Sequence, residues 1–300
     1  MTVTARGAGL AAIAADGIRL RGAWGEHGAP VAAAESVSGA FDLVVVATKA
    51  GDLEAALEQN AGATAPRWLV VRNGLGARDA ARRLLSPPPG TEVLGGLAVF
   101  AASSPNPGEA SVTAAGPLYV GGPEADAFAS ALQPALPAVA VADLAGAEWT
   151  KLIVNQVNAL PAITGLSAQQ TIADPTLRRV LTRSIREAIG VARMNGVRFA
   201  ELQGLSDGLL RGVCVVPPFL AQLVPLAMAR RMGSVPNPGS TLQSIRRGRR
   251  TEIDWLNGAV VAAARAVGAE APVNSALTRL VHEVESTGRF FSVDEVSAAL

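Results

Sequence analysis

Two lysines stand out among the basic residues of this chain. Of its 26 lysine and arginine residues, only Lys49 and Lys151 are lysines. An arginine side chain stays protonated in a protein, whereas the pKa of a lysine amine shifts with burial and neighbouring charge. Either the sequence has drifted toward arginine and these two lysines remain by chance, or their amines have a chemical role. Their local sequences favour the second interpretation.

Lys151 lies on a predicted helix together with two asparagines. Residues 147–160 have the spacing of a helix, in which Asn155 lies four and Asn158 seven residues after Lys151. These spacings place three polar side chains on one face of a helix rich in apolar residues. A solvated stripe, the alternative, would more often carry Glu, Arg or Gln, because asparagine is a poor helix former. We therefore expect this face to line a cleft.

A second polar cluster comes later in the chain. Thr251 can cap a helix that opens with the carboxylate of Glu252, where a negative charge suits the helix dipole. That structural role does not explain Asn257 and Gly258 inside the predicted helix 252–268, since an interior glycine costs about 1 kcal/mol relative to alanine. Close helix packing or an approaching ligand would explain the pair.

The elements that must position these residues divide into two halves. Residues 43–48 are an apolar run typical of a strand buried on both faces, residues 68–71 are the next predicted strand, and a helix is predicted between them. This strand–helix–strand rhythm continues to residue 142 and predicts a doubly wound, largely parallel sheet. Long helical periods follow. We therefore predict an α/β Rossmann-like domain over residues 1–142 and an all-α domain over residues 143–300.

Composition excludes several classes of function. The chain has 300 residues, of which 49% are hydrophobic and 17% charged, and a formal net charge of +1 that gives no reason to expect nucleic-acid binding. The single cysteine, Cys214, excludes an internal disulfide and fits a reducing compartment. Because the N-terminus lacks the pattern of a secretion signal, we expect a cytoplasmic location. The sequence contains no pair of His or Cys residues at the spacing of metal ligands, so it predicts no metal site.

The most apolar stretch, residues 212–228, is too short to span a bilayer. A spanning helix needs about 20 apolar residues, and this stretch contains three prolines. We therefore expect no membrane insertion. The alternatives are a buried helical hairpin, a cover over a cleft, or a subunit contact in a homodimer.

Several of these motifs together resemble the 2-dehydropantoate 2-reductase (ketopantoate reductase) family. The family's order and spacing are matched by Thr48-Lys49-Ala50, Asn73-Gly74-Leu75-Gly76, Lys151 to Asn155, and Ser240 to Gly258. The resemblance covers nearly the whole chain, and its most specific part begins at Thr251. It implies an NADP-binding Rossmann-like domain, a helical substrate domain, and NADPH-dependent reduction of a small 2-oxo acid such as 2-dehydropantoate.

The resemblance also implies roles for individual residues. Lys151 would be the general acid that protonates the ketone oxygen, and Glu252 would bind the substrate hydroxyl and help to hold the lysine. The substrate would be bound by Asn155, Asn158 and Ser240. The cofactor would be bound by Arg6, Lys49 and Asn73.

The chain departs from the family at Ser244, where an aspartate is common, and at Asn158, which lies one position closer to Lys151 than usual. At the start, residues 1–6 resemble the family's second strand with its arginine. We therefore expect the first strand, glycine-rich turn and helix, about 25 residues, to be absent. Two alternatives concern this region: Gly7-Ala8-Gly9-Leu10-Ala11-Ala12 as the dinucleotide fingerprint, or the strand of residues 1–5 in the vacant central place of the sheet.

Two other functions are compatible with the sequence. An incomplete dinucleotide domain is compatible with a non-catalytic module that binds or dimerises. Ser244 and the long apolar stretch before it are compatible with a reductase of a different branched oxo or hydroxy acid.

Overall fold

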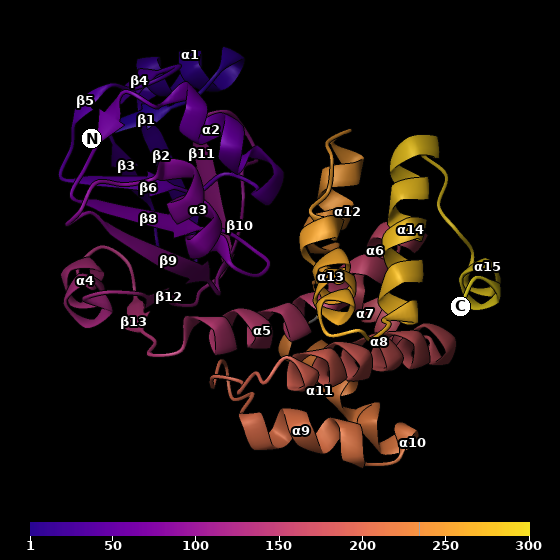
Figure 1. The fold of residues 1–300 in the computed structure, drawn as a ribbon. Helices are drawn as coiled ribbons and strands as arrows, with labels where there is room; N and C mark the ends of the chain where they lie inside the picture. The colour runs from indigo at the N-terminus through magenta and orange to yellow at the C-terminus, as the bar shows by residue number, and fades with distance from the viewer. Residues whose placement is uncertain (234) are drawn as a thin grey trace. The chain divides into compact units, whose positions relative to one another are not determined.

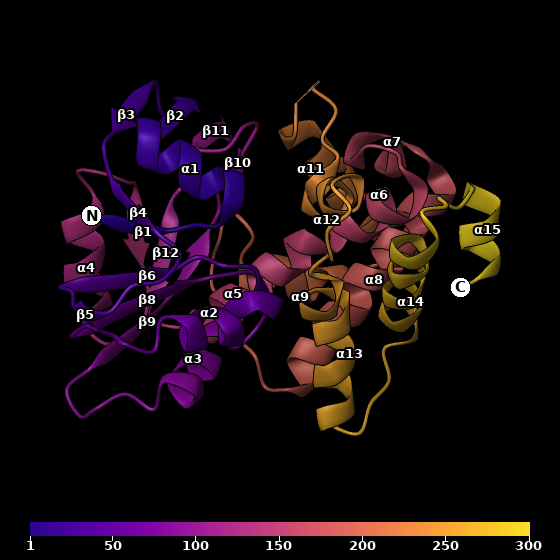
Figure 2. The same ribbon diagram turned by 90° about the horizontal axis from the view of Figure 1, so that it is seen from above.

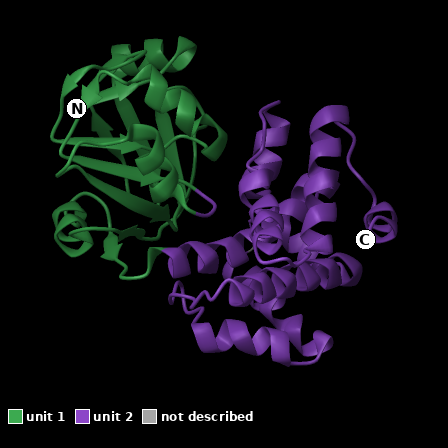
Figure 3. Ribbon diagram, in the orientation of Figure 1, with its two compact units in different colours: residues 1–72, 76–144 green, residues 73–75, 145–300 purple. Residues whose placement is uncertain are grey.

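The computed structural model describes residues 1–233 and 235–300. Figure 3 shows the chain divided into two compact units, residues 1–72 with 76–144 and residues 73–75 with 145–300. The first unit is α/β and the second is helical, so the predicted fold class is confirmed. The short segment Asn73–Leu75 follows a strand of the first unit in sequence and yet belongs to the second unit.

A five-stranded sheet forms the centre of the first unit (Figure 1). In spatial order its strands are β13 (Ala138–Ala140), β12 (Leu118–Gly121), β9 (Glu92–Ala98), β8 (Arg67–Val71) and β6 (Leu43–Val46). All neighbouring pairs are parallel except β12 with β9, which is antiparallel. The predicted sheet is therefore present, with one antiparallel step.

Side chains that alternate along β8 explain why helices cover both faces of this sheet. Trp68 and Val70 belong to the apolar cluster that contains residues of α2 (Leu53–Gln59) and α3 (Ala77–Leu85). Leu69 points to the opposite face, into a cluster with α4 (Ala125–Leu132). A strand buried on both faces needs this apolar run, because successive side chains point in opposite directions. Figure 2 shows the helices and strands of this unit from a second direction.

The first strand, β1 (Thr2–Thr4), does not enter the five-stranded sheet. It pairs in parallel with β4 (Ala32–Ala34) in a sheet of its own, and the helix α1 (Gly7–Asp16) follows it. The strand β6 is an edge of the larger sheet, and its Val45 is 52% exposed, so the prediction that residues 43–48 are buried on both faces is wrong. The alternative in which residues 1–5 take a central place beside β6 is therefore wrong.

The remaining strands form two small sheets. The four-stranded sheet consists, in spatial order, of β10 (Ala101–Ser103), β11 (Glu109–Ala114), β2 (Ile18–Gly22) and β3 (His27–Ala29). The two-stranded sheet consists of β5 (Gly39–Ala40) and β7 (Ala63–Thr64).

The second unit is built around the 20-residue helix α8 (Pro175–Met194), which contacts several of the other helices (Figure 1). Asp174 caps it, accepting hydrogen bonds from the backbone N–H groups of Thr176 at 2.8 Å and Leu177 at 2.9 Å. Proline at the first helical position has no backbone N–H that needs an acceptor. The start of the helix at Asp174-Pro175 is therefore determined by neighbouring residues. The other helices are α5 (Leu144–Asn155), α6 (Ala159–Thr164), α7 (Ala168–Ala173), α9 (Asp207–Val215), α10 (Pro218–Ala221), α11 (Leu223–Arg231), α12 (Gly239–Arg246), α13 (Asn257–Ala266), α14 (Pro272–Thr287) and α15 (Val293–Ala298).

The apolar stretch 212–228 is not a buried hairpin. It contains the end of α9, all of α10 and the first part of α11, and the side chains of Val215, Phe219 and Leu223 are mostly exposed. Within the described residues, no helix has both the length and the apolar character needed to cross a membrane.

Burial predicts different costs for two valines on the paired strands β6 and β8. Val70 is 1% exposed in the core, whereas Val45 is 52% exposed. We expect Val70→Ala to lower the free energy of unfolding by about 2 kcal/mol, since it removes buried apolar volume and leaves a cavity. Val45→Ala should change it by less than about 0.5 kcal/mol. Urea denaturation of both variants checks this, and equal losses would contradict the assignment of the two faces.

Candidate active site

Lys151 lies on α5, whose apolar face anchors it in the helical core. Trp149, Leu152 and Ile153 are buried in that core, and Lys151 itself is partly buried. Burial of the amine, opposed by the carboxylate of Glu252, lowers the pKa of Lys151 from 10.5 to about 8. The amine is therefore close to half protonated near pH 8 and can give or take a proton there.

Glu252 is held by an amide from a distant part of the chain. The side-chain Nδ2 of Asn73 donates a hydrogen bond to Oε2 of Glu252 at 3.2 Å. The bond joins residues that are 179 positions apart, and it lies within the second unit. Asn73, predicted to bind the cofactor, thus also orients the carboxylate beside Lys151.

Gly74 lets the backbone of this segment approach Glu252. Its φ is +90°, and a Cβ at this position would lie 2.6 Å from the carbonyl oxygen of Trp255. Any side chain would therefore collide with the backbone three residues after Glu252. Glycine is needed here both for its positive φ and for the close approach.

The helix predicted to begin at Glu252 begins later. Ile253–Trp255 form a 3₁₀ turn, labelled η3, and α13 starts only at Asn257. The Asn257-Gly258 pair consequently lies in the first turn of the helix and not in its interior, which corrects the sequence prediction. Glu252 precedes both elements, and its carbonyl oxygen accepts hydrogen bonds from the backbone N–H groups of Trp255 at 3.0 Å and Leu256 at 3.1 Å.

The polar face expected around Asn155 and Asn158 is only partly helical. The helix α5 ends at Asn155, and a 3₁₀ turn, η2 (Gln156–Asn158), follows. The predicted continuous α-helical stripe is thus wrong, because the turn changes the angular spacing. The structure still brings the two side chains together, with Nδ2 of Asn158 donating to Oδ1 of Asn155 at 3.4 Å.

Asn158 in turn contacts the start of α12, which carries Ser240. Gly239 has a φ of +70°, and a Cβ there would lie 2.6 Å from Oδ1 of Asn158. The side chain of Ser240 is exposed at the first turn of this helix. One turn later, the hydroxyl of Ser244 donates to the carbonyl oxygen of Ser240 at 3.1 Å. Ser244, at the position where an aspartate was expected, is therefore bonded to the backbone of Ser240.

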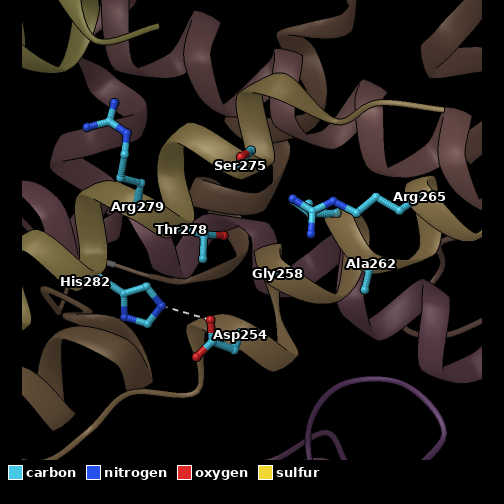
Figure 4. A pocket seen from close by; sticks show the side chains of 9 residues that line it. Asp254, Gly258, Ala262, Arg265, Ser275, Thr278, Arg279 and His282 are labelled. Atoms are coloured by element: carbon cyan, nitrogen blue, oxygen red, sulfur yellow. Dashed lines mark hydrogen bonds and ion pairs between the residues drawn. The ribbon is translucent and has the colours of Figure 1, made fainter.

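A second set of charged groups fixes the segment around Glu252. The backbone N–H of Thr251 donates to Oε1 of Glu285 at 2.7 Å, and the other carboxylate oxygen of Glu285 lies 2.7 Å from Nδ1 of His282. The Nε2 of His282 contacts Oδ1 of Asp254 at 2.9 Å (Figure 4). The residues on either side of Glu252, Thr251 and Asp254, are therefore both bonded to side chains of α14.

Asp254 and His282 also line a shallow groove along α13 and α14 (Figure 4). The groove has a volume of about 520 Å³, and its other walls include Arg265, Ser275 and Thr278. None of the site residues predicted from sequence is among the described residues that line it.

Comparisons with known proteins decide the family. The family described as Ketopantoate reductase PanE/ApbA matches residues 1–124, and the one described as Ketopantoate reductase PanE/ApbA C terminal matches residues 143–285. The chain belongs to the ketopantoate reductase family. The resemblance found in the sequence is thereby confirmed, and membership places the chain among the oxidoreductases.

Individual relatives agree with this assignment. The 2-dehydropantoate 2-reductase of Archaeoglobus fulgidus is 26% identical, covering 82% of this chain and 77% of its own. That of Mesorhizobium japonicum is 27% identical over 95% of this chain and 90% of its own. The crystal structure of a PanE/ApbA family ketopantoate reductase from Ralstonia eutropha has a TM-score of 0.79 at 28% identity, covering 95% of this chain and 90% of its own.

The two remaining site candidates of this family member lie in the first unit. Arg6 is exposed two residues after β1 and Lys49 lies three residues after β6, so each cation follows the carboxyl end of a parallel strand, although the two strands belong to different sheets. Such ends are where open α/β sheets bind phosphate-bearing ligands, so their charge fits a dinucleotide. Gly7 begins α1, and no described atom lies within 4 Å of a Cβ built on it. The space beside Gly7 is therefore open, and the alternative of a dinucleotide fingerprint at residues 7–12 stays a prediction.

Sequence reasoning missed the role of His282. It lies in a polar segment, and its spacing of three residues from Glu285 on a helix was a signal that the two side chains could meet. The contact of His282 with Asp254 in η3 joins distant parts of the sequence, and no local sequence pattern predicts it.

Gly239 and Gly248 give a matched test of the contact with Asn158. Both have positive φ, +70° and +62°, but nothing lies within 4 Å of a Cβ built on Gly248. Each alanine variant should lose about 1 kcal/mol of unfolding free energy from backbone strain. Gly239→Ala should lose about 1–3 kcal/mol more, because Asn158 must move. Urea denaturation measures the unfolding free energy of both variants. Equal losses in the two variants would show that Asn158 moves aside at no cost.

The attachments of His282 predict a pH-dependent stability. Partial burial lowers the pKa of His282, but the hydrogen bonds and charges of Glu285 and Asp254 outweigh it and raise the pKa above 6.5. A raised histidine pKa stabilises the folded state fully below the unfolded value and loses that effect as pH rises through the folded value. We expect His282→Ala to cost about 0.2–1 kcal/mol at pH 5.5 and less at pH 9, where the neutral ring has one N–H to donate to two carboxylates. A loss that grows with pH contradicts this.

Proposed function

We propose that this chain reduces the ketone of a small 2-oxo acid of the 2-dehydropantoate type, with NADPH as hydride donor and Lys151 as general acid. The observation that supports it most is the partly buried amine of Lys151, with a pKa of about 8, beside the carboxylate of Glu252. The names of the relatives supply the substrate class, since several are 2-dehydropantoate 2-reductases.

The chemistry requires two electrons and one proton. NADPH, when bound, would supply the hydride for the carbonyl carbon. The ammonium of Lys151 polarises the carbonyl oxygen and transfers a proton to it as negative charge develops there. The product is a 2-hydroxy acid, and the neutral amine regains its proton from solvent.

Glu252 has two roles in this scheme. Its negative charge raises the pKa of Lys151 against the effect of burial, which keeps part of the amine protonated at working pH. Its carboxylate also accepts a hydrogen bond from the hydroxyl of the substrate. The amide of Asn73 holds Oε2 at 3.2 Å and so orients the carboxylate for both tasks.

The substrate's polar groups are proposed to bind Asn155, Asn158 and Ser240. The exposed hydroxyl of Ser240 lies in the first turn of the eight-residue helix α12, where backbone N–H groups and the helix dipole favour a carboxylate. The amides of Asn155 and Asn158 hydrogen-bond each other weakly at 3.4 Å and have further donors and acceptors for the substrate hydroxyls.

NADP is preferred over NAD in this proposal because of Arg6. Its guanidinium is exposed at the end of β1, where it suits the 2′-phosphate that distinguishes the two dinucleotides. Lys49 would contact the phosphates or a ribose of the same cofactor.

Substitution of Lys151 tests the proposal. With 2-dehydropantoate and NADPH, monitored by the absorbance of NADPH, Lys151→Met should lower kcat by about 10²–10⁴-fold while the far-ultraviolet circular dichroism stays unchanged. For the wild type, kcat should fall as pH rises through about 8, because the ammonium is lost.

Lys151→Arg is the matched control, since it keeps the charge but not the transferable proton. Its residual activity should lack the decline near pH 8. Full turnover by Lys151→Met would remove the lysine from the mechanism. A wild type that binds NADPH but reduces no 2-oxo acid would favour the non-catalytic binding module.

A further inference from the structure

Five polar side chains form a hydrogen-bonded network inside the otherwise apolar core of the second unit. Four of them, Gln156, Ser184, Asn257 and Asn274, are fully buried with 0% exposure, and Glu187 is partly buried. They come from η2, α8, α13 and α14. Buried polar groups are costly unless hydrogen bonds replace water, so such a network requires an explanation.

Asn257 is the centre of this network. Its Nδ2 donates to Oε1 of Gln156 at 2.8 Å and to Oδ1 of Asn274 at 2.9 Å. The amide of Asn274 donates in turn to Oε2 of Glu187 at 2.6 Å, and the Glu187 carboxylate accepts the backbone N–H groups of Val273 and Asn274 at the start of α14. The hydroxyl of Ser184 donates to the same Gln156 oxygen at 2.8 Å.

Both ends of the Asn257–Gln156 bond lie close in sequence to the proposed catalytic pair. The Nε2 of Gln156 donates to the carbonyl oxygen of Leu152, the residue after Lys151, at 3.1 Å. Asn257 is the first residue of α13 and lies five residues after Glu252. The bond thus joins the end of the helix that carries Lys151 to the segment that carries Glu252.

We infer that Asn257 and Gln156 are positioning residues: their hydrogen bond sets the separation of Lys151 from Glu252. The inference rests on the proposed function, in which that separation controls the general acid. Neither residue is proposed to touch the substrate.

Stability alone does not account for Asn257. Its Oδ1 is buried without a hydrogen-bond partner among the described residues, which costs free energy that an apolar side chain would avoid. A leucine of similar size would also leave the hydroxyl of Ser184 within reach of the oxygens of Gln156 and Asn274, at 2.8 and 3.1 Å. What leucine cannot replace is the direct link between η2 and α13. Buried amides are known to specify register at some cost in stability.

The chain offers a measurement of this separation that does not depend on activity. Because it contains only two lysines, protein labelled with ¹³Cε-lysine gives two side-chain NMR signals, and Lys49→Arg assigns them. Titration of the Lys151 signal in the full chain then reports its pKa. The charge of Glu252 raises that pKa, so a larger separation should lower it.

We expect Asn257→Leu to lower the pKa of Lys151 by about one unit and to reduce kcat about 10- to 100-fold, with KM changed by less than about threefold. Gln156→Met breaks the same bond from the other side and should give the same shift. The double variant should shift the pKa no further than either single variant, because all three lose one interaction. The second single variant keeps the test valid if one of them does not fold.

Thr182→Val is the matched control. Thr182 is a buried polar residue of α8, 3% exposed, and its hydroxyl donates a hydrogen bond to the carbonyl oxygen of Arg178 at 2.8 Å. Its loss should leave the Lys151 titration unchanged. A folded Asn257→Leu protein with an unchanged Lys151 pKa overturns the inference, as does an equal shift in Thr182→Val. An inactive wild type would count against the proposed function, whereas the NMR titration would still decide the inference.

Discussion

The amine of Lys151 lies where burial and a carboxylate act in opposite directions. Burial removes hydration and favours the neutral amine, while the charge of Glu252 favours the ammonium, and the balance is a pKa of about 8. A fully exposed amine would hold its proton to above pH 10, and a buried amine without the charge of Glu252 would have a still lower pKa. The proposed acid therefore depends on one separation between two side chains.

Several local devices of the second unit keep Glu252 in place. Gly74 allows a backbone approach that brings the amide of Asn73 to the carboxylate. The late start of α13 leaves Glu252 outside the helix, and Glu285 holds the preceding Thr251 through its backbone N–H. Each device removes one way for the carboxylate to move, so the orientation of Glu252 follows from several weak constraints and not from one strong one.

Local patterns explain why much of the fold could be predicted. The apolar run in β8 and the Asp174-Pro175 start of α8 act through neighbouring residues, and a single sequence contains them. The same sequence placed Lys151 on a helix but could not place Asn73 beside Glu252, because that contact joins residues 179 positions apart. The catalytic and binding roles of the site residues follow from the family resemblance. Geometry alone does not supply those roles.

The start of α13 shows how a distant contact can override a local signal. Thr251 and Glu252 satisfy the rules for a helix start, yet the helix begins at Asn257. At this position Asn257 donates hydrogen bonds to Gln156 and Asn274, which are 101 and 17 residues away in sequence. Gly258 then falls in the first turn, where a Cβ would make ordinary contacts of 3.4–3.6 Å with η3. Neither close packing nor a ligand is needed to explain the glycine, and the informative residue of the pair is the asparagine.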